Sequence, residues 1–218
     1  NIWNKEILLS ATSSLIHRGP DAFGLYYNAE KGIGLGHRRL SIIDLSDKAN
    51  QPMYSHDNRY IMVYNGEVYN YREIADKFFK NINLITTSDS EVILELFALK
   101  GPSFVHELNG IFSIAIYDSL LDELYIFRDR VGVKPLVYYY DNVNFIFSSE
   151  LKAILKFNIS KEINFTSLQD YLFLEYVPAD QTIFKQIKKL PAGHYMKITK
   201  NDFNIYCYYD ILDKINNS

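Results

Sequence analysis

The sequence has 218 residues, with 23 lysines and arginines against 26 aspartates and glutamates, and a single cysteine. A net charge of -3 makes the chain a poor binder of polyanions, so nucleic acid is not expected as a partner. One cysteine excludes an internal disulfide framework, and no run approaches the ~18 apolar residues that span a bilayer. We therefore expect a cytoplasmic protein without a membrane segment, long enough to build its own core.

The first half of the chain alternates between helical and strand-like patterns. Apolar spacing predicts a helix over residues 4–16, with Asn4 as its N-cap, and Gly19-Pro20 ends it. Asn65-Gly66 is flanked by strand-like runs and, taken alone, indicates a hairpin turn. Ser88 or Asp89 caps a helix that runs to residue 100. The other expected elements here are strands at 23–28, 33–40, 60–64 and 68–71 and a helix at 71–80.

The second half is rich in strands. Alternating apolar residues predict strands at 111–118, 123–129, 136–140, 144–147 and within 195–209, with helices at 150–156 and 167–174. Antiparallel hairpins together with grouped helices indicate an α+β fold, with two sheets and helices on the outside.

Five polar segments could carry chemistry, and each also has a purely structural interpretation. Residues 17–21 read as a polar helix end, in which Arg18 and Asp21 can pair. Arg38 and Arg39 should point to opposite faces of a strand, so that one can reach into a cleft and hold a carboxylate. The remaining three are the turn at Asn65-Gly66, the cap at Asp89, and the charged segment 127–136, read as a solvated loop or an ion-pair network.

No cofactor or metal motif stands out. The five histidines form no i, i+4 pair and there is no second cysteine, so no metal site is predicted. Phosphate-binding glycine loops and the dinucleotide fingerprint are also missing from the sequence. A Ser–His–Asp triad stays open, although no nucleophile-elbow spacing supports one.

Seven segments in this order resemble one family: the class II glutamine amidotransferase domain of the N-terminal-nucleophile hydrolases, in the version fused to asparagine synthetases. The sequence Asn-Gly-Glu-Val-Tyr-Asn at 65–70 is typical of that version. The resemblance spans most of residues 10–210, and its segments are 17–21, 37–44, 65–70, 88–92, 112–118, 128–136 and 148–154.

This resemblance implies a four-layer αββα sandwich of two antiparallel sheets and a glutaminase that passes ammonia to an ATP-using domain. It implies that Arg39 clamps the glutamine α-carboxylate, with the backbone of Leu40, Ser41, Ile42 and Ile43 lining the same pocket. Asn65 and Gly66 would donate to the oxyanion, while Glu67 and Asp89 would hold the α-ammonium. No cofactor is implied within the domain; ATP and magnesium belong to the synthetase domain.

The family's nucleophile is an N-terminal cysteine whose α-amine acts as general base. We expect that cysteine, and the first strand that carries it, to be absent from this chain, which would then be inactive as it stands. Cys207 is expected to be a structural strand residue. Residues 1–210 would form the amidotransferase domain and 211–218 the start of a linker toward a C-terminal synthetase domain.

Two alternatives stay open. The chain could be a degenerate, structural amidotransferase-like domain of a β-lactam or lasso-peptide synthetase, or a non-catalytic glutamine-binding module. The amide acceptor is aspartate by the family's default, with a sugar or other carboxylate as the alternative, and a homodimer is one oligomeric state that the resemblance allows.

Overall fold

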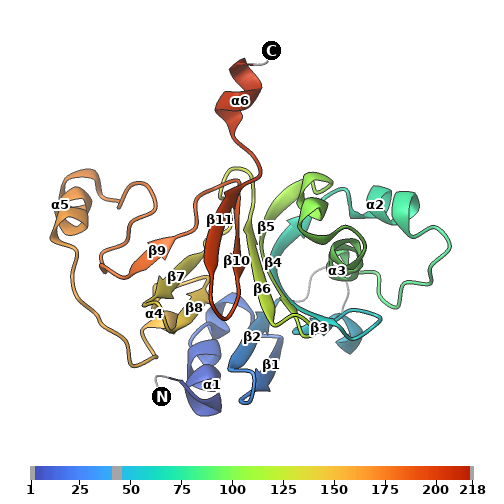
Figure 1. The fold of residues 1–218 in the computed structure, drawn as a ribbon, viewed down its shortest axis with the longest axis horizontal. Coiled ribbons are helices and arrows are strands. Elements are labelled where there is room, and N and C mark those ends of the chain that lie inside the picture. The colour runs from blue at the N-terminus through green and yellow to red at the C-terminus, as the bar shows by residue number, and fades with distance from the viewer. Residues whose placement is uncertain (1–2, 41–45, 217–218) are drawn as a thin grey trace.

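The computed structural model describes residues 3–40 and 46–216 (Figure 1). Its largest sheet has six antiparallel strands in the order β11-β10-β6-β5-β4-β3. These strands are β3 Met53–Tyr54, β4 Tyr60–Val68, β5 Gly110–Asp118, β6 Glu123–Arg128, β10 His194–Ile198 and β11 Phe203–Cys207.

Two smaller antiparallel sheets lie opposite this one. The first is a hairpin of β1 Ala22–Asn28 and β2 Ile33–Arg39. The second has the order β8-β7-β9, from β7 Val137–Tyr140, β8 Phe145–Ser148 and β9 Ile187–Lys189. The helices are α1 Lys5–Ser13, α2 Tyr71–Phe78, α3 Asp89–Lys100, α4 Leu151–Ile154, α5 Phe165–Leu174 and α6 Ile211–Asn216.

Side-chain packing confirms the αββα layering. One core lies between the six-stranded sheet and the helices α2 and α3, around Phe97 and Phe127. A second lies between the six-stranded sheet and the two smaller sheets and contains Leu35, Ile126 and Met196. Helices α1 and α4 cover the outer side of the small sheets (Figure 1). The second β-layer therefore consists, in the described residues, of two separate sheets rather than one.

The sequence-based turn at Asn65-Gly66 is wrong, because β4 runs without interruption through both residues. Asn65 lies opposite Ser113 and Gly66 opposite Phe112 of β5. A Cβ atom on Gly66 would lie 2.2 Å from the carbonyl oxygen of Ile111. The glycine thus permits a close approach between two central strands. In the sequence, Asn-Gly looks the same whether it forms a turn or lies within a strand.

Several boundaries also differ from the expected ones. Asn4 caps α1 as predicted, with its side chain accepting from the N–H of Ile7 at 2.8 Å, but the helix ends at Ser13 and continues as a 3-10 turn at Ile16–Arg18. The helix expected over 150–156 is a single turn, α4, and residues 211–216 are the helix α6, which projects from the body (Figure 1).

The charged segment 127–136 is neither a solvated loop nor an ion-pair network. Asp129 is fully buried, and its carboxylate accepts from the backbone N–H groups of Val133 at 2.9 Å and Lys134 at 3.0 Å. Arg128 donates in turn to the carbonyls of Lys134, Gly132 and Leu190. Both charges therefore satisfy backbone groups of the loop, which a list of charged residues does not reveal.

A carboxylate also joins two segments far apart in the sequence. Glu150, directly before α4, accepts from Arg18 at 3.0 Å and lies 3.0 Å from the ring nitrogen Nε2 of His17. Partial burial favours a higher pKa for Glu150, but the hydrogen bonds from Arg18, His17 and Lys152 outweigh it and lower the pKa to about 2. The end of α1 is thereby held against α4.

None of the helices in the described residues has the length and apolar character that crossing a membrane requires.

Asp129→Ala should lower the free energy of unfolding by about 3 kcal/mol or more, because several buried backbone donors lose their acceptor. Asp76→Ala, at an exposed position of α2, should change it by less than about 0.5 kcal/mol. Denaturant unfolding of both variants measures the difference, and equal losses would contradict the role given to Asp129.

Stability should fall in acid partly through Glu150. Its pKa in the folded protein, about 2, lies below the ordinary value of 4.5, so its contribution is complete above about pH 4.5 and is lost as the pH falls toward 2. Glu150→Gln should therefore flatten the dependence of unfolding free energy on pH in this window. An unchanged slope in the variant would show that the ion pair does not contribute.

Candidate functional site

The outer edge of β4 is left open over the residues that the sequence singles out. Among the described residues, β3 pairs with β4 only at Ile61 and Met62. The N–H groups of Tyr64 and Val68 point to this edge, because each donates to a side chain there. Backbone groups alternate along a strand, so the N–H of Gly66 points to the same edge, between these two.

Asp89 binds the backbone at the C-terminal end of this edge. Ser88 caps α3 by accepting from the N–H of Ser90, and Asp89 is the first residue of the helix. The Oδ2 atom of Asp89 accepts from the N–H of Val68 at 3.0 Å and from the hydroxyl of Tyr64 at 2.7 Å. Burial and the Asp89 carboxylate raise the pKa of Tyr64, so its hydroxyl stays a donor at neutral pH.

Glu91 fixes the chain that leads into this helix. Its carboxylate is almost fully buried and accepts from the N–H groups of Ile85 at 2.8 Å and Thr86 at 2.6 Å. It also lies 2.7 Å from the ring of His56. Burial favours a higher pKa for Glu91, but these hydrogen bonds outweigh it and hold the pKa below its ordinary value. Glu91 therefore stays an acceptor and keeps Ser88 and Asp89 in place.

Arg39 is connected to the same edge through two neighbouring residues. It ends β2 and donates to the side chain of Asn50 at 2.8 Å. The next residue, Gln51, is buried and accepts from the N–H of Tyr64 at 2.6 Å. Leu40 is exposed, and Ser41, Ile42 and Ile43, expected to line the pocket by their backbone, lie outside the described residues.

Asn65 and Glu67 occupy the other face of β4. Side chains two residues apart in a strand share a face, and that face turns toward the small sheets, where Val63 belongs to the second core. Glu67 is exposed. The side-chain nitrogen of Asn65 is buried and makes no hydrogen bond within the described structure. Asn65 therefore has an N–H donor that is available to a bound molecule.

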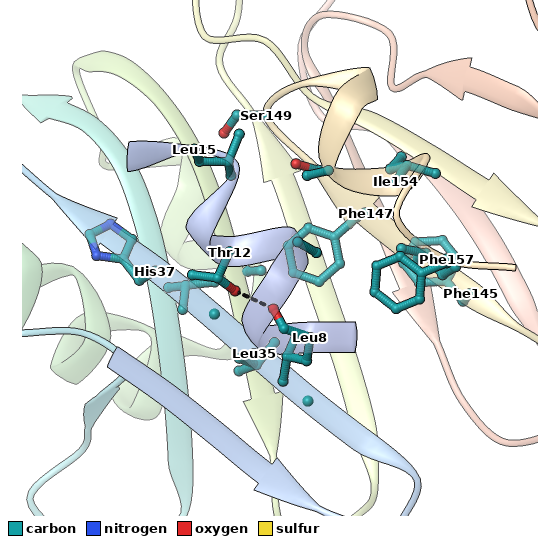
Figure 2. Close-up of a pocket in the computed structure, with 18 of the residues that line it drawn as sticks. Leu8, Thr12, Leu15, Leu35, His37, Phe145, Phe147, Ser149, Ile154 and Phe157 are labelled. Carbon is teal, nitrogen blue, oxygen red and sulfur yellow. Dashed lines mark hydrogen bonds between the residues drawn. The ribbon is translucent and has the colours of Figure 1, made fainter. Parts of the chain in front are cut away.

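A cavity of about 270 Å³ lies next to Asn65, between β2 and β8. Both strands are sheet edges that face the cavity with residues 33–38 and 143–149. Figure 2 shows Leu35 and His37 on the β2 side and Phe145 and Phe147 on the opposite side, with α1 between the two in this view. A Cβ atom on Gly36 would lie 2.0 Å from Thr12 Oγ1, so glycine lets α1 pack directly onto β2.

The structure thus links most of the residues that the sequence singles out around one edge of β4. Asn65 and Gly66 lie on β4 itself, Asp89 binds its backbone, and Arg39 reaches it through Asn50 and Gln51. Sequence reasoning missed Gln51 and the individual role of His37, since no local pattern shows that either residue contacts Tyr64. Cys207 is exposed at the end of β11 and is not among the residues that line the cavity.

The polar groups around this edge are suited to a zwitterionic ligand. Among the described residues, no three His, Cys, Asp or Glu side chains come together as metal ligands. A guanidinium and two carboxylates match an amino acid's carboxylate and ammonium groups. The paired donors of Gly66 and Asn65 match a carbonyl oxygen that gains negative charge.

Comparison with known proteins identifies the family. Residues 2–209 match the family model described as "Glutamine amidotransferase domain". The protein of Methanocaldococcus jannaschii provisionally named asparagine synthetase [glutamine-hydrolyzing] 2 is 39% identical over 96% of this chain and 44% of its own length. Asparagine synthetase [glutamine-hydrolyzing] 2 of Bacillus subtilis is 34% identical over 95% of this chain and 28% of its own length.

The fold has a solved counterpart. Glutamine phosphoribosylpyrophosphate amidotransferase from B. subtilis superposes with a TM-score of 0.67 at 16% identity, over 94% of this chain and 46% of that chain. The chain spans less than half the length of these relatives. The fold is thus that of this solved amidotransferase, and the chain belongs to the glutamine amidotransferase domain family.

Proposed function

We propose that this chain is the glutaminase part of an asparagine synthetase and that the β4 edge binds L-glutamine. In the parent protein, the ammonia released from glutamine serves the ATP-dependent amidation of aspartate. The observation that carries the proposal is the edge itself, where the N–H of Gly66 lies between two N–H groups that Gln51 and Asp89 already satisfy.

Each group of glutamine has a matching partner at this site. Arg39 binds the α-carboxylate, while Glu67 and Asp89 bind the α-ammonium. Asp89 accepts two hydrogen bonds through Oδ2, whereas Oδ1 accepts only a long one from the Ser88 hydroxyl, at 3.4 Å. In this proposal Oδ1 is the oxygen that binds the ammonium. The carboxamide oxygen then lies toward Gly66 and Asn65, which stabilise the negative charge that develops when a nucleophile attacks the carbonyl carbon.

The nucleophile comes, in this proposal, from a strand seated between β2 and β8. Within residues 3–40 and 46–216, neither β2 nor β8 has a strand partner on the side that faces the cavity, and one added strand would pair with both edges. Its residue beside Asn65 would be an N-terminal cysteine, whose α-amine takes the thiol proton and later passes it to the leaving ammonia. The 218-residue chain itself, whose cysteine is Cys207, would bind glutamine without hydrolysing it.

An exposed apolar surface supports a larger assembly. Helix α5 exposes Phe165, Leu172 and Phe173, with 75%, 75% and 86% of their surfaces accessible. Ile211 and Leu212 of α6 are also exposed. Apolar groups of this size in a helical row are typical of an interface, and we assign this one to the synthetase part of the parent chain, since the relatives are more than twice as long.

Arg39→Ala should weaken binding of L-glutamine to the chain by about tenfold or more, because a charge-assisted contact to the α-carboxylate is lost. Arg72→Ala, at an exposed position on α2, is the matched control and should bind as the wild type does. Isothermal calorimetry measures both. Equal affinities for wild type and Arg39→Ala would remove Arg39 from the site.

A version of the chain extended by an upstream strand that begins with cysteine should melt at a higher temperature than the 218-residue chain, because β2 and β8 then gain partners. The same version should release ammonia from glutamine, and its Cys→Ala variant should keep the higher melting temperature but release none. Equal melting temperatures would contradict the added strand between β2 and β8, and no ammonia from the extended protein would refute the proposed glutaminase activity.

A further inference from the structure

Two buried polar atoms of the described residues have no hydrogen-bond partner: Nδ1 of His37 and the side-chain nitrogen of Asn65. Both residues line the cavity between β2 and β8. They are also neighbours, because His37 Nε2 lies 3.0 Å from the carbonyl oxygen of Tyr64, the residue before Asn65. Unsatisfied buried polar atoms are rare in folded proteins and call for an explanation.

The chemistry of the histidine nitrogen follows from its other bond. Burial and the nearby Arg39 lower the pKa of His37 to about 4, although the Tyr64 carbonyl acts in the opposite direction, so the imidazole is neutral at pH 7. A carbonyl oxygen can only accept, so Nε2 carries the proton. Nδ1 is therefore an acceptor, and it has no donor in the structure.

The cavity thus presents one acceptor, from His37, and one donor, from Asn65. A primary carboxamide is complementary to this pair, since its oxygen accepts and its nitrogen donates. A carboxylate is not complementary, because both of its oxygens are acceptors and one of them would face the lone pair of His37 Nδ1.

We propose that His37 Nδ1 accepts a hydrogen bond from the carboxamide N–H of glutamine while Asn65 donates to its oxygen, so that His37 selects glutamine over glutamate. This inference rests on the proposed glutamine site and adds a specificity-determining residue to it. Sites that hydrogen-bond a substrate N–H reject analogues without that group more strongly than apolar pockets reject a size difference. The same contact would favour release of the glutamate product.

Two substitutions separate the acceptor at Nδ1 from the contact with Tyr64. In His37→Asn the side-chain oxygen lies two bonds from Cβ, as Nδ1 does, and can keep the acceptor. In His37→Gln the terminal amide lies three bonds from Cβ, as Nε2 does, and can keep the bond to the Tyr64 carbonyl but not the acceptor.

Calorimetry of the 218-residue chain with L-glutamine and L-glutamate tests the proposal. The wild type should prefer glutamine, His37→Asn should keep that preference within about threefold, and His37→Gln should lose about tenfold of it or more. A preference that survives in His37→Gln, or that is lost only in His37→Asn, would overturn the role of His37 and leave the glutamine site intact. No binding of glutamine by the wild type would overturn both.

A second measurement does not depend on how the variants fold. In the wild type, the ¹⁵N resonance of His37 Nδ1 should move on addition of glutamine, because an acceptor nitrogen gains a hydrogen bond, and should not move with glutamate. The same shift with both ligands, or no shift with either, would contradict the proposal.

Discussion

The open edge of β4 is the constraint on which the rest of the site depends. A strand edge presents backbone N–H and C=O groups that must be paired, covered or solvated. Here β3 pairs with β4 only at Ile61 and Met62, and side chains take over beyond that point. Gln51 accepts from Tyr64, Asp89 accepts from Val68, and the N–H of Gly66 between them points to the same open edge.

Most of the surrounding structure holds this edge in one geometry. The cap at Ser88 and the buried carboxylate of Glu91 fix the start of α3, and so the position of Asp89. Gly66 keeps β4 close to β5, because any side chain would meet the backbone of Ile111. The polar groups at this edge are therefore held by strands and by the start of α3. We expect them to reorganise little when a ligand binds.

The cavity beside the edge gives the two unpaired atoms a common explanation. His37 and Asn65 come from different sheets and meet where the two β-layers face each other. Each atom would be costly if it stayed unsatisfied. Together they are complementary to a ligand group that both donates and accepts a hydrogen bond. The family assignment alone does not specify such a group.

Apolar periodicity and capping residues such as Asn4 and Ser88 are local signals, and they predicted most of the elements and an α+β fold with helices outside two sheets. The four-layer αββα order came from the family resemblance. Local signals failed at Asn65-Gly66, where glycine is required because β5 lies close to it and not because the chain turns there. They also failed for Asp129, whose partners are backbone groups, and for Gln51 and His37, whose importance arises only when β2, β4 and the segment between them meet.

The central claim is that glutamine binds at the open edge of β4. Backbone amide NMR of the 218-residue chain during titration with L-glutamine tests it most directly. The account predicts that the Gly66 amide shows one of the largest shifts, with neighbouring shifts at Val68 and Asp89. Glutamine binding that leaves the Gly66 amide unchanged would contradict it.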